Sequence, residues 1–389
     1  MSTRNVVLGD IADTCLGKML DQNKNKGDYQ PYLANVNVRW GSFDLDNLPQ
    51  MRFLESEEER YGLKYGDILV CEGGEPGRCA IWKDQIPNMK FQKALHRVRV
   101  HEEEVDFRWL FYRFLYAKSR GEFDQYFSGT TTIKHMPGEK LVKIRLDLPE
   151  LTYQRQIGEI LSAYDSLIEN NQKQIKLLEE AAQRLYKEWF VDLRFPGYEN
   201  TKIVDGVPEG WCFGTVDTLI EYHDKKRKPL SSMERSEFQG NYKYYGAAGV
   251  LDHVKEFLFD GTYLLLGEDG TVITDDGFPV LQYVNGQFWV NNHAHVLTGK
   301  DCYSTEYIYM MFKNIKVSDV VTGVAQPKIS QARLSAKKIM IPETKLVLEY
   351  SEIVKPYLQM VLVLQEQNER LAESRDRLLP KLMSGEVEV

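Results

Sequence analysis

The sequence predicts an α+β fold with two repeat-related globular parts, each followed by a long helix of coiled-coil type. Three observations predict this arrangement. An internal repeat relates the two halves of the 389-residue chain. Each globular part combines short β-branched and aromatic runs with one amphipathic helix. Heptad-spaced apolar residues fill the segment that follows each copy of a Pro-Glu pair.

The repeat is clearest in two basic phrases that run into an apolar strand. FSGTTTIKHMPGEKLVKIRLDLPE at 127–150 matches VTGVAQPKISQARLSAKKIMIPE at 321–343. A fixed period of this kind indicates two copies of a half of roughly 195 residues. The aligned pairs are Gly129 with Gly323, Lys134 with Lys328, and Pro149-Glu150 with Pro342-Glu343. The predicted parts are globular parts at 1–148 and 196–341 and long helices at 149–195 and 342–389.

Both globular parts show strand and turn signals. GDILVCEGG, RCAIWKD, TYLLLGEDG and QFWVNN are apolar runs bounded by Gly, Asn and Asp. DFRWLFYRFLYAK predicts a helix with Asp106 as its N-cap, and STEYIYMMFKNI predicts one capped by Ser304 or Thr305. We expect the aromatic stripes of these helices to lie in the core rather than to stack on bases.

The segment from Gln154 to about Phe190 contains no Pro and only one Gly, Gly158. Its apolar residues follow a heptad pattern, which predicts a coiled-coil helix of roughly 55 Å. RFPGYE ends this helix, because Pro cannot extend it and Gly caps it. The seam positions are Ile157, Leu161, Tyr164, Ile168, Ile175, Leu178, Ala182, Leu185 and Trp189, and in the second copy Tyr350, Val354, Tyr357, Val361, Leu364, Leu371, Leu378 and Leu382.

Each predicted seam carries one asparagine. If the two helices pair antiparallel, the position of Asn171 maps onto that of Asn368. We hypothesise that the two form a buried polar pair that fixes the register of the coiled coil. The alternative is that both asparagines are solvated.

Composition bounds the class of protein. The formal net charge of −8 argues against a simple nucleic-acid binder, although KFQKALHRVR, DKKRK and KISQARLSAKK are locally basic. Five scattered cysteines without a Cys-x-x-Cys pair favour a reducing compartment. No apolar run reaches the ~20 residues of a membrane span. We therefore expect a soluble cytoplasmic protein.

Motifs for catalysis are missing from the sequence. There is no Gly-x-Gly-x-x-Gly after a strand, no nucleoside triphosphate loop, and no Asn/Asp-Pro-Pro-aromatic motif of an amino-methyltransferase. His293 and His295 would share one face of a strand, but no third ligand follows, so a structural or DNA-facing role is favoured over a metal. We expect no catalytic residues and no metal site in this chain.

The repeated basic phrases suit nucleic acid. The Thr130–Thr132 run offers hydroxyl groups and a methyl that can contact thymine, Lys134 and His135 are donors, and Gln326 is a candidate adenine reader. Basic residues elsewhere would contact phosphates. The candidate DNA-binding residues are Thr130, Thr131, Thr132, Lys134, His135, Lys93, Arg97, Gln326, Lys328, Ser330, Gln331, Lys225 and Lys226.

The whole chain resembles the specificity subunit of type I restriction-modification systems. The resemblance is carried by the two-fold repeat, by LPELTYQRQIGEILSAYDSLIENNQKQIKLLEEAAQRLYKEWFVDLRFPGYE, by VPEGW, by YYGAAGVLDHVKEFLFDGTYLLLGEDG and by the C-terminal LLPKLMSGEVEV. It implies two target-recognition domains joined by an antiparallel two-helix coiled coil with pseudo-twofold symmetry. Each domain would read one half of a bipartite DNA sequence.

The resemblance also implies partners that supply the chemistry. Two methyltransferase subunits would bring S-adenosylmethionine, and two restriction subunits would bring ATP hydrolysis, Mg and cleavage. This chain would be the non-catalytic specificity subunit and would hold no cofactor. Two alternatives remain at this point: a stand-alone sequence-specific DNA-binding protein, and a coiled-coil scaffold that binds only protein. A neighbouring adenine methyltransferase gene would separate the first alternative from the favoured interpretation, and random duplex pools would test the second.

Overall fold

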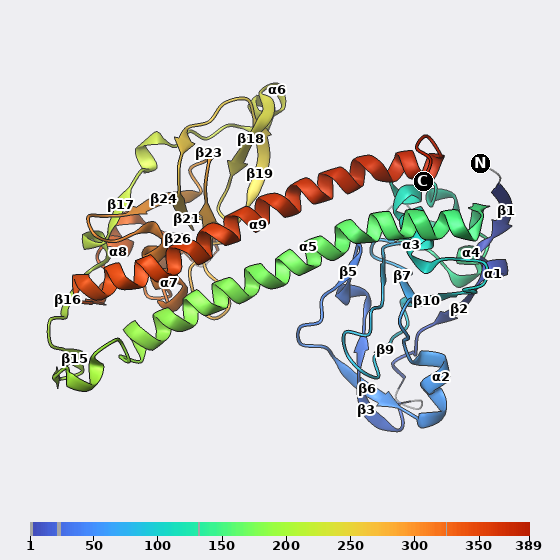
Figure 1. Cartoon of the computed structure of the whole chain (residues 1–389), viewed down its shortest axis with the longest axis horizontal. Coiled ribbons are helices and arrows are strands. Elements are labelled where there is room, and N and C mark those ends of the chain that lie inside the picture. The colour runs from blue at the N-terminus through green and yellow to red at the C-terminus, as the bar shows by residue number, and fades with distance from the viewer. Residues whose placement is uncertain (1–2, 22–24, 131–132, 324) are drawn as a thin grey trace. The chain divides into compact units, whose positions relative to one another are not determined.

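The computed structural model describes residues 3–21, 25–130, 133–323 and 325–389 (Figure 1). The chain divides into two compact units. The first comprises Met1–Ile168 with Glu369–Val389, and the second comprises Glu169–Asn368. Each unit contains strands, short helices and a stretch of both long helices. The predicted α+β class is therefore confirmed.

A four-stranded sheet forms the centre of the first unit, in the order β2 (Ala12–Leu16), β10 (Leu95–Val100), β7 (Ile68–Cys71), β8 (Cys79–Ile81). Alternate residues of β7 enter two different cores. Ile68 and Val70 pack in a core with α3 (Phe107–Ser119), whereas Leu69 and Cys71 pack in a second core on the opposite face. Both faces of the sheet are covered, which explains why this strand is a continuous apolar run.

The remaining elements of the first unit surround this sheet. β3 (Asp28–Leu33) lies between β6 (Gln50–Phe53) and β9 (Lys90–Phe91), and β1 (Thr3–Val7) pairs with β13 (Arg145–Pro149). The others are α1 (Leu8–Ile11), β4 (Val38–Arg39), β5 (Ser42–Phe43), α2 (Glu58–Tyr61), β11 (Ser128–Thr130), β12 (Ile133–His135) and α4 (Gly138–Leu141).

The second unit repeats this architecture. Its central sheet has the order β17 (Ile220–Tyr222), β24 (Ala294–Gly299), β21 (Tyr263–Gly267), β22 (Leu281–Val284), and α7 (Thr305–Asn314) covers one face. A second sheet, β19 (Val250–Val254), β18 (Gln239–Tyr245), β23 (Gln287–Val290), β20 (Phe259–Asp260), covers the other. The others are β14 (Ile203–Val204), β15 (Val207–Pro208), β16 (Cys212–Thr215), α6 (Ser232–Glu237), β25 (Val321–Thr322), β26 (Lys328–Ile329), α8 (Gln331–Ser335) and β27 (Lys338–Ile341).

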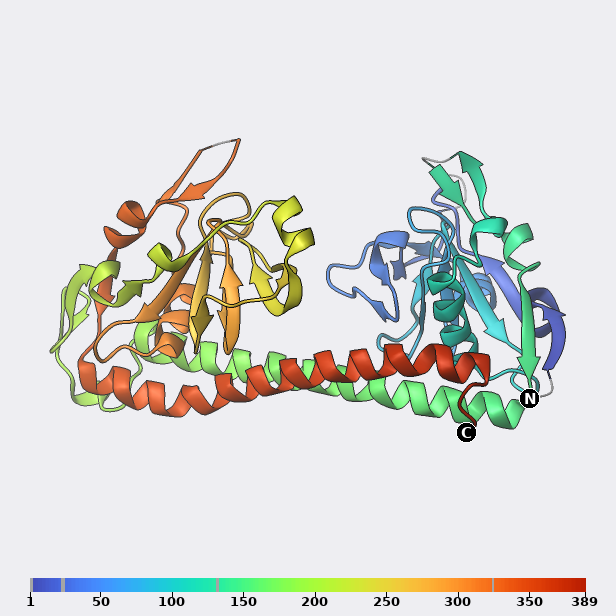
Figure 2. The same cartoon turned by 90° about the horizontal axis from the view of Figure 1, so that it is seen from above.

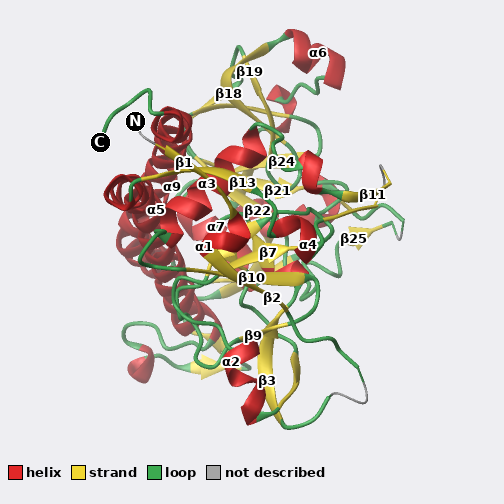
Figure 3. Ribbon diagram, turned by 90° about the vertical axis from the view of Figure 1, so that its right-hand side faces the viewer, coloured by secondary structure: helices red, strands yellow, loops and turns green. Residues whose placement is uncertain are grey.

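The duplicated basic phrases fold into the same succession of elements in both units. Each begins as a two-stranded antiparallel hairpin, β11–β12 or β25–β26. A short helix follows, then a strand that pairs with a strand near the start of its half, β13 with β1 and β27 with β16, and then a long helix. Within each unit the hairpin extends on the side away from the long helices (Figures 2 and 3). The internal repeat read from the sequence is thus a repeat of structure.

The two long helices are α5 (Leu151–Tyr186), continued by a π-helical turn at Lys187–Val191, and α9 (Thr344–Ser384). In the first unit Tyr153 Oη donates to the Val387 carbonyl at 3.2 Å. In the second unit Tyr350 Oη donates to the Ala182 carbonyl at 2.9 Å. Residues of α5 therefore meet α9 residues in reverse order, and the predicted seam positions are buried or half-buried. The helices form an antiparallel coiled coil.

Both predicted helix caps are present. Asp106 accepts hydrogen bonds from the backbone N–H groups of Arg108 and Trp109, and Ser304 accepts one from Tyr307. The aromatic stripes lie in the cores, as predicted; Trp109 and Tyr307 are 2% and 1% exposed. None of the helices in the described ranges combines the length and apolarity needed to cross a bilayer.

The predicted polar pair at Asn171 and Asn368 lies in the second unit. Asn171 is buried, and its Nδ2 lies 3.5 Å from Oε1 of Gln367. Oδ1 of Asn368 is buried and accepts no hydrogen bond from the residues that the structure describes. The polar partner of Asn171 in the structure is thus the residue beside Asn368, and direct contact between the two asparagines stays a prediction.

Candidate nucleic-acid interface

Two hydrogen bonds tie the residue that follows hairpin β11–β12 to the central sheet of the first unit and the turn after β7. The backbone N–H of Met136, just after β12, donates to the Glu72 carbonyl at 2.7 Å, and the N–H of Glu72 donates to Ala94 at 2.9 Å. His96, on the sheet strand β10, places Nε2 3.2 Å from the Met136 carbonyl. The segment that leaves the hairpin is therefore held by one backbone bond and one side chain.

The second unit repeats this pattern atom by atom. The N–H of Ile329 donates to the Glu268 carbonyl at 2.8 Å, and the N–H of Glu268 donates to His293 at 2.8 Å. His295, on β24, places Nε2 2.8 Å from the Ile329 carbonyl. Glu72 and Glu268 directly follow equivalent strands, β7 and β21, so the two hairpins are mounted on equivalent sites.

The two histidines differ in their hydrogen-bond partners. A carbonyl oxygen only accepts, so Nε2 is a donor in both rings. In His295, Nδ1 also lies 2.6 Å from Oδ2 of Asp224, and a carboxylate likewise accepts. Both ring nitrogens of His295 therefore face oxygen acceptors. Burial lowers the pKa of His96 below its ordinary value, although the Glu72 carboxylate and the Met136 carbonyl act to raise it.

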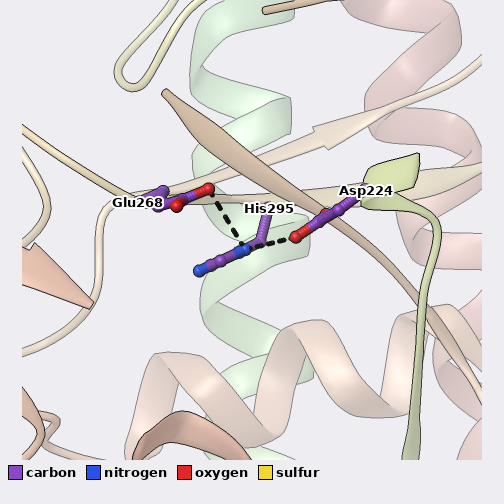
Figure 4. A group of neighbouring side chains, drawn as sticks. All are labelled: Asp224, Glu268 and His295. Carbon is purple, nitrogen blue, oxygen red and sulfur yellow. Dashed lines mark hydrogen bonds and ion pairs between the residues drawn. The ribbon is translucent and has the colours of Figure 1, made fainter. Parts of the chain in front are cut away.

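His295 belongs to a buried charge cluster, which we define as Asp224, Arg227, Glu268 and His295. Figure 4 shows three of these residues, Asp224, Glu268 and His295. Arg227 bridges the two acids, 3.2 Å from Asp224 and 2.7 Å from Glu268. His295 is only 1% exposed. Each carboxylate of the cluster therefore has a cationic partner in Arg227, and Glu268 has a second one in Lys328.

The pKa of Asp224 reflects this arrangement. Burial acts to raise it, but hydrogen bonds and charge from His295, the Val296 N–H and the Gln331 amide outweigh burial and hold the pKa below its ordinary value. Gln331 Nε2 donates to Oδ2, and the Val296 N–H donates to Oδ1 at 2.8 Å. Asp224 is therefore fully engaged as an ionised acceptor.

Asp224, Glu268 and His295 bring three potential metal-ligand atoms within 4.8 Å of one another. The donor set does not suit a metal ion, however. Both ring nitrogens of His295 are already engaged with oxygen acceptors, and the Arg227 guanidinium already neutralises the carboxylates. The structural role predicted for a histidine in this pair therefore applies to His295. His293 is exposed and its Nδ1 bonds to Asp269.

The lowered pKa of His96 predicts that the stability of the chain depends on pH. The folded His96 binds a proton less readily than the unfolded residue, so the free energy of unfolding should fall as pH drops below about 6.5. Urea unfolding at pH 7.5 and 5.5 measures this change. His96→Gln, which keeps an N–H donor but cannot titrate, should reduce the difference between the two pH values; an unchanged difference would contradict the assignment.

The candidate DNA-binding residues of the first unit differ in their surroundings. Lys134 and His135 are exposed on β12, with Lys134 Nζ 5.5 Å from the centre of the Phe127 ring. Lys93 is exposed and borders a pocket of about 290 Å³. Thr130 is the last residue of β11. Thr131 and Thr132 lie outside the described residues.

Arg97 does not occupy a DNA-accessible position. It is 6% exposed, and its guanidinium donates to the backbone carbonyls of Arg60 at 2.9 Å and Gly62 at 3.4 Å. Burial lowers its pKa. The basic run KFQKALHRVR extends from β9 into β10, and the β10 residues are buried or half-buried because both faces of the central sheet are covered. We therefore drop Arg97 from the candidate interface.

In the second unit, Gln326 and Lys328 are exposed on hairpin β25–β26, and Lys225 and Lys226 are exposed in the nearby loop. Lys328 Nζ lies 3.2 Å from Oε1 of Glu268, at the rim of the charge cluster. Two predicted residues have local partners instead. Ser330 caps α8 by accepting from the Arg333 N–H, and Gln331 donates to Asp224.

Sequence reasoning missed the acids and the arginine of the charge cluster. Asp224 and Arg227 both lie within the basic run DKKRK, whose lysines were predicted to contact phosphates. One feature of the sequence could have identified the histidine that holds each hairpin. His96 and His295 fall at matching places in the two halves, as do Glu72 and Glu268, and matched buried-type polar residues in a repeat indicate a shared structural contact.

Fold and site together define a class: a tandem-repeat protein that presents two equivalently mounted polar hairpins on units connected by an antiparallel coiled coil. The family model for the type I restriction modification DNA specificity domain matches residues 3–180 and 208–371. The chain therefore belongs to this family, whose members are specificity subunits rather than catalytic subunits.

Individual relatives agree with this assignment. The MjaIX specificity subunit of Methanocaldococcus jannaschii is 25% identical over 83% of this chain and 78% of its own length. The putative specificity subunit S.HindORF215P of Haemophilus influenzae is 29% identical over 39% of this chain and 38% of its own. The crystal structure of a type I S subunit from M. genitalium superposes with a TM-score of 0.63 at 17% identity, over 98% of this chain and 96% of that one, which shows a shared fold.

Proposed function

We propose that this chain reads a bipartite double-stranded DNA target, one half with each unit. The observation that supports this most directly is the repeated hairpin. Both copies are fixed to the central sheet by the same hydrogen bonds, and both expose a lysine at the aligned positions 134 and 328. The two hairpins are held in the same way but expose different side chains, which suits two half-sites that differ in sequence.

The proposal includes the partners that carry out the chemistry. Two methyltransferase subunits would supply S-adenosylmethionine and modify an adenine in each half-site, and two restriction subunits would supply ATP hydrolysis with Mg and cleave. The long helices would set the spacing between half-sites, since reading successive major grooves requires centres about 34 Å apart.

The acidity of the chain shapes the expected binding behaviour. With a net charge of −8, the isolated chain should bind DNA weakly and with strong salt dependence. The partner subunits would add phosphate contacts, so the assembled complex should bind tightly. Tight, salt-insensitive binding by the isolated chain would contradict this.

Substitutions on the two hairpins test the proposal. Lys134→Ala should lower affinity for all duplexes, because a lysine contact to phosphate is independent of sequence, whereas Gln326→Ala should relax discrimination at one base pair by about 1–3 kcal/mol. Selection from a random duplex pool followed by sequencing measures both effects. Lys202→Ala, which removes an exposed lysine beside β14, is the matched control.

The outcomes separate the proposal from its alternatives. Unchanged affinity and unchanged sequence preference in both hairpin variants would remove the hairpins from the interface. A wild-type chain that selects no sequence from the pool, alone or with its methyltransferase, would leave only a protein-binding role.

A further inference from the structure

The two buried histidines lie where no DNA can touch them, yet each bonds directly to a hairpin that we assign to DNA reading. His96 and His295 are 2% and 1% exposed. Each projects from the strand β10 or β24 that runs next to β7 or β21 in the middle of its central sheet. Each accounts for one of the two anchors of the segment that leaves its hairpin, through the carbonyl of Met136 or Ile329.

We propose that His96 and His295 are positioning residues for target recognition: each pins its reading hairpin to the central sheet, and each controls sequence choice in one half-site only. This inference rests on the proposed function. The physical basis is that base readout requires donors and acceptors to be held within a fraction of an ångström, and a β-hairpin of two or three residues per strand is too short to hold its own position.

The second unit holds its hairpin more firmly than the first. The charge cluster grips the exit of β25–β26 at two points, since His295 bonds to Ile329 and Asp224 accepts from Gln331 two residues further on. Lys328 of the hairpin adds an ion pair to Glu268 of the cluster. In the first unit, the described hydrogen bonds that hold the exit of β11–β12 are those of Met136 with the Glu72 carbonyl and with the His96 side chain. Because each histidine bonds to the hairpin segment of its own unit, loss of His96 or of His295 should affect sequence choice in one half-site only.

Asparagine and glutamine distinguish the two ring nitrogens. The amide nitrogen of glutamine can take the place of Nε2, whereas that of asparagine reaches only the place of Nδ1. His96→Gln should keep the bond to Met136, and His96→Asn should lose it. His295→Gln should keep the bond to Ile329 and give up the one to Asp224; His295→Asn should do the reverse. His253, exposed on β19, gives the control variant His253→Asn.

The first arm of the experiment requires no DNA. Hydrogen–deuterium exchange on the full-length chain follows peptides that cover residues 127–136 and 321–330. His96→Asn should speed exchange in the first peptide alone, and His295→Asn in the second alone, by roughly 5- to 100-fold, as expected when a buried hydrogen bond is lost. His96→Gln and His253→Asn should stay close to the wild type, and His295→Gln, which gives up its bond to Asp224, should exchange more slowly than His295→Asn in the second peptide.

The second arm measures sequence choice with the same full-length variants and a pool of random duplexes. Each asparagine variant should flatten the base preference in one half of the selected motif and leave the other half intact, and each glutamine variant should restore it. A purely structural residue would lower stability without this half-specific loss and rescue.

The two arms have distinct failures. Equal exchange and equal base preference in His96→Asn and wild type would overturn the proposal, as would loss of preference in both halves together. A wild type that selects no motif would instead contradict the proposed function, and the exchange arm would still decide whether the histidines pin the hairpins. If His295→Asn does not fold, the His96 pair gives the same decision in the first unit.

Discussion

Replacing Asp224 with alanine is expected to lower the free energy of unfolding of the second unit by about 3–5 kcal/mol, the cost of removing one partner from a buried ion pair. Asp224 accepts from His295, Val296 and Gln331 and pairs with Arg227. Its loss leaves the Arg227 guanidinium with one carboxylate of the cluster in place of two. Urea unfolding, followed by tryptophan fluorescence at pH 7.5, measures the change.

The control for this experiment is another aspartate of the same unit. Asp275 is exposed, and Asp275→Ala should change stability by no more than about 0.5 kcal/mol. The lowered pKa of Asp224 also fixes the sign of a pH effect. Its stabilising contribution is complete above the unfolded pKa of about 3.9 and is lost as pH falls through the lower folded value. An Asp224→Ala variant as stable as Asp275→Ala would contradict the cluster.

Tyr350→Ala is the second substitution with a large expected effect, a loss of about 3–5 kcal/mol for the second unit. Tyr350 is fully buried on α9, and its ring packs against those of Tyr186, Trp189, Phe190 and Tyr307. The change would leave a cavity where the coiled coil meets α7. Chemical unfolding measures it, with loss of the near-ultraviolet circular dichroism signal as a second reading.

Tyr350→Phe separates the ring from the hydroxyl. It keeps the aromatic packing and removes only the hydrogen bond to Ala182, so it should cost about 1 kcal/mol. Equal losses in the two variants would show that the hydroxyl, and not the packing between the long helices and the globular part, carries the stabilisation.

The parts of the fold that follow from local patterns could be predicted from the sequence. Heptad spacing gave the seam, in which Leu161 and Val361 are buried, and Asp106 gave the start of α3 through its cap. These features depend on neighbours within one or two helical turns. Self-similarity added the repeat, which the hairpins and the central sheets confirm.

The parts that depend on distant neighbours could not be predicted. Arg97 and His295 both lie on central sheet strands, and only the pairing of strands with their neighbours decides which residues face inward. Asp224 meets His295 across a sequence separation of 71 residues. Asn171 hydrogen-bonds to Gln367, the residue beside Asn368, a detail that heptad spacing alone does not resolve; direct contact between the two asparagines stays a prediction.

Genome-wide adenine methylation mapping, in cells that carry this chain and its methyltransferase partner and in cells that lack this chain alone, tests the central claim most directly. The account predicts a methylated motif with two specified halves and an unspecified spacer of fixed length, present only when the chain is present. A single uninterrupted motif, or a methylation pattern that persists without the chain, would contradict it.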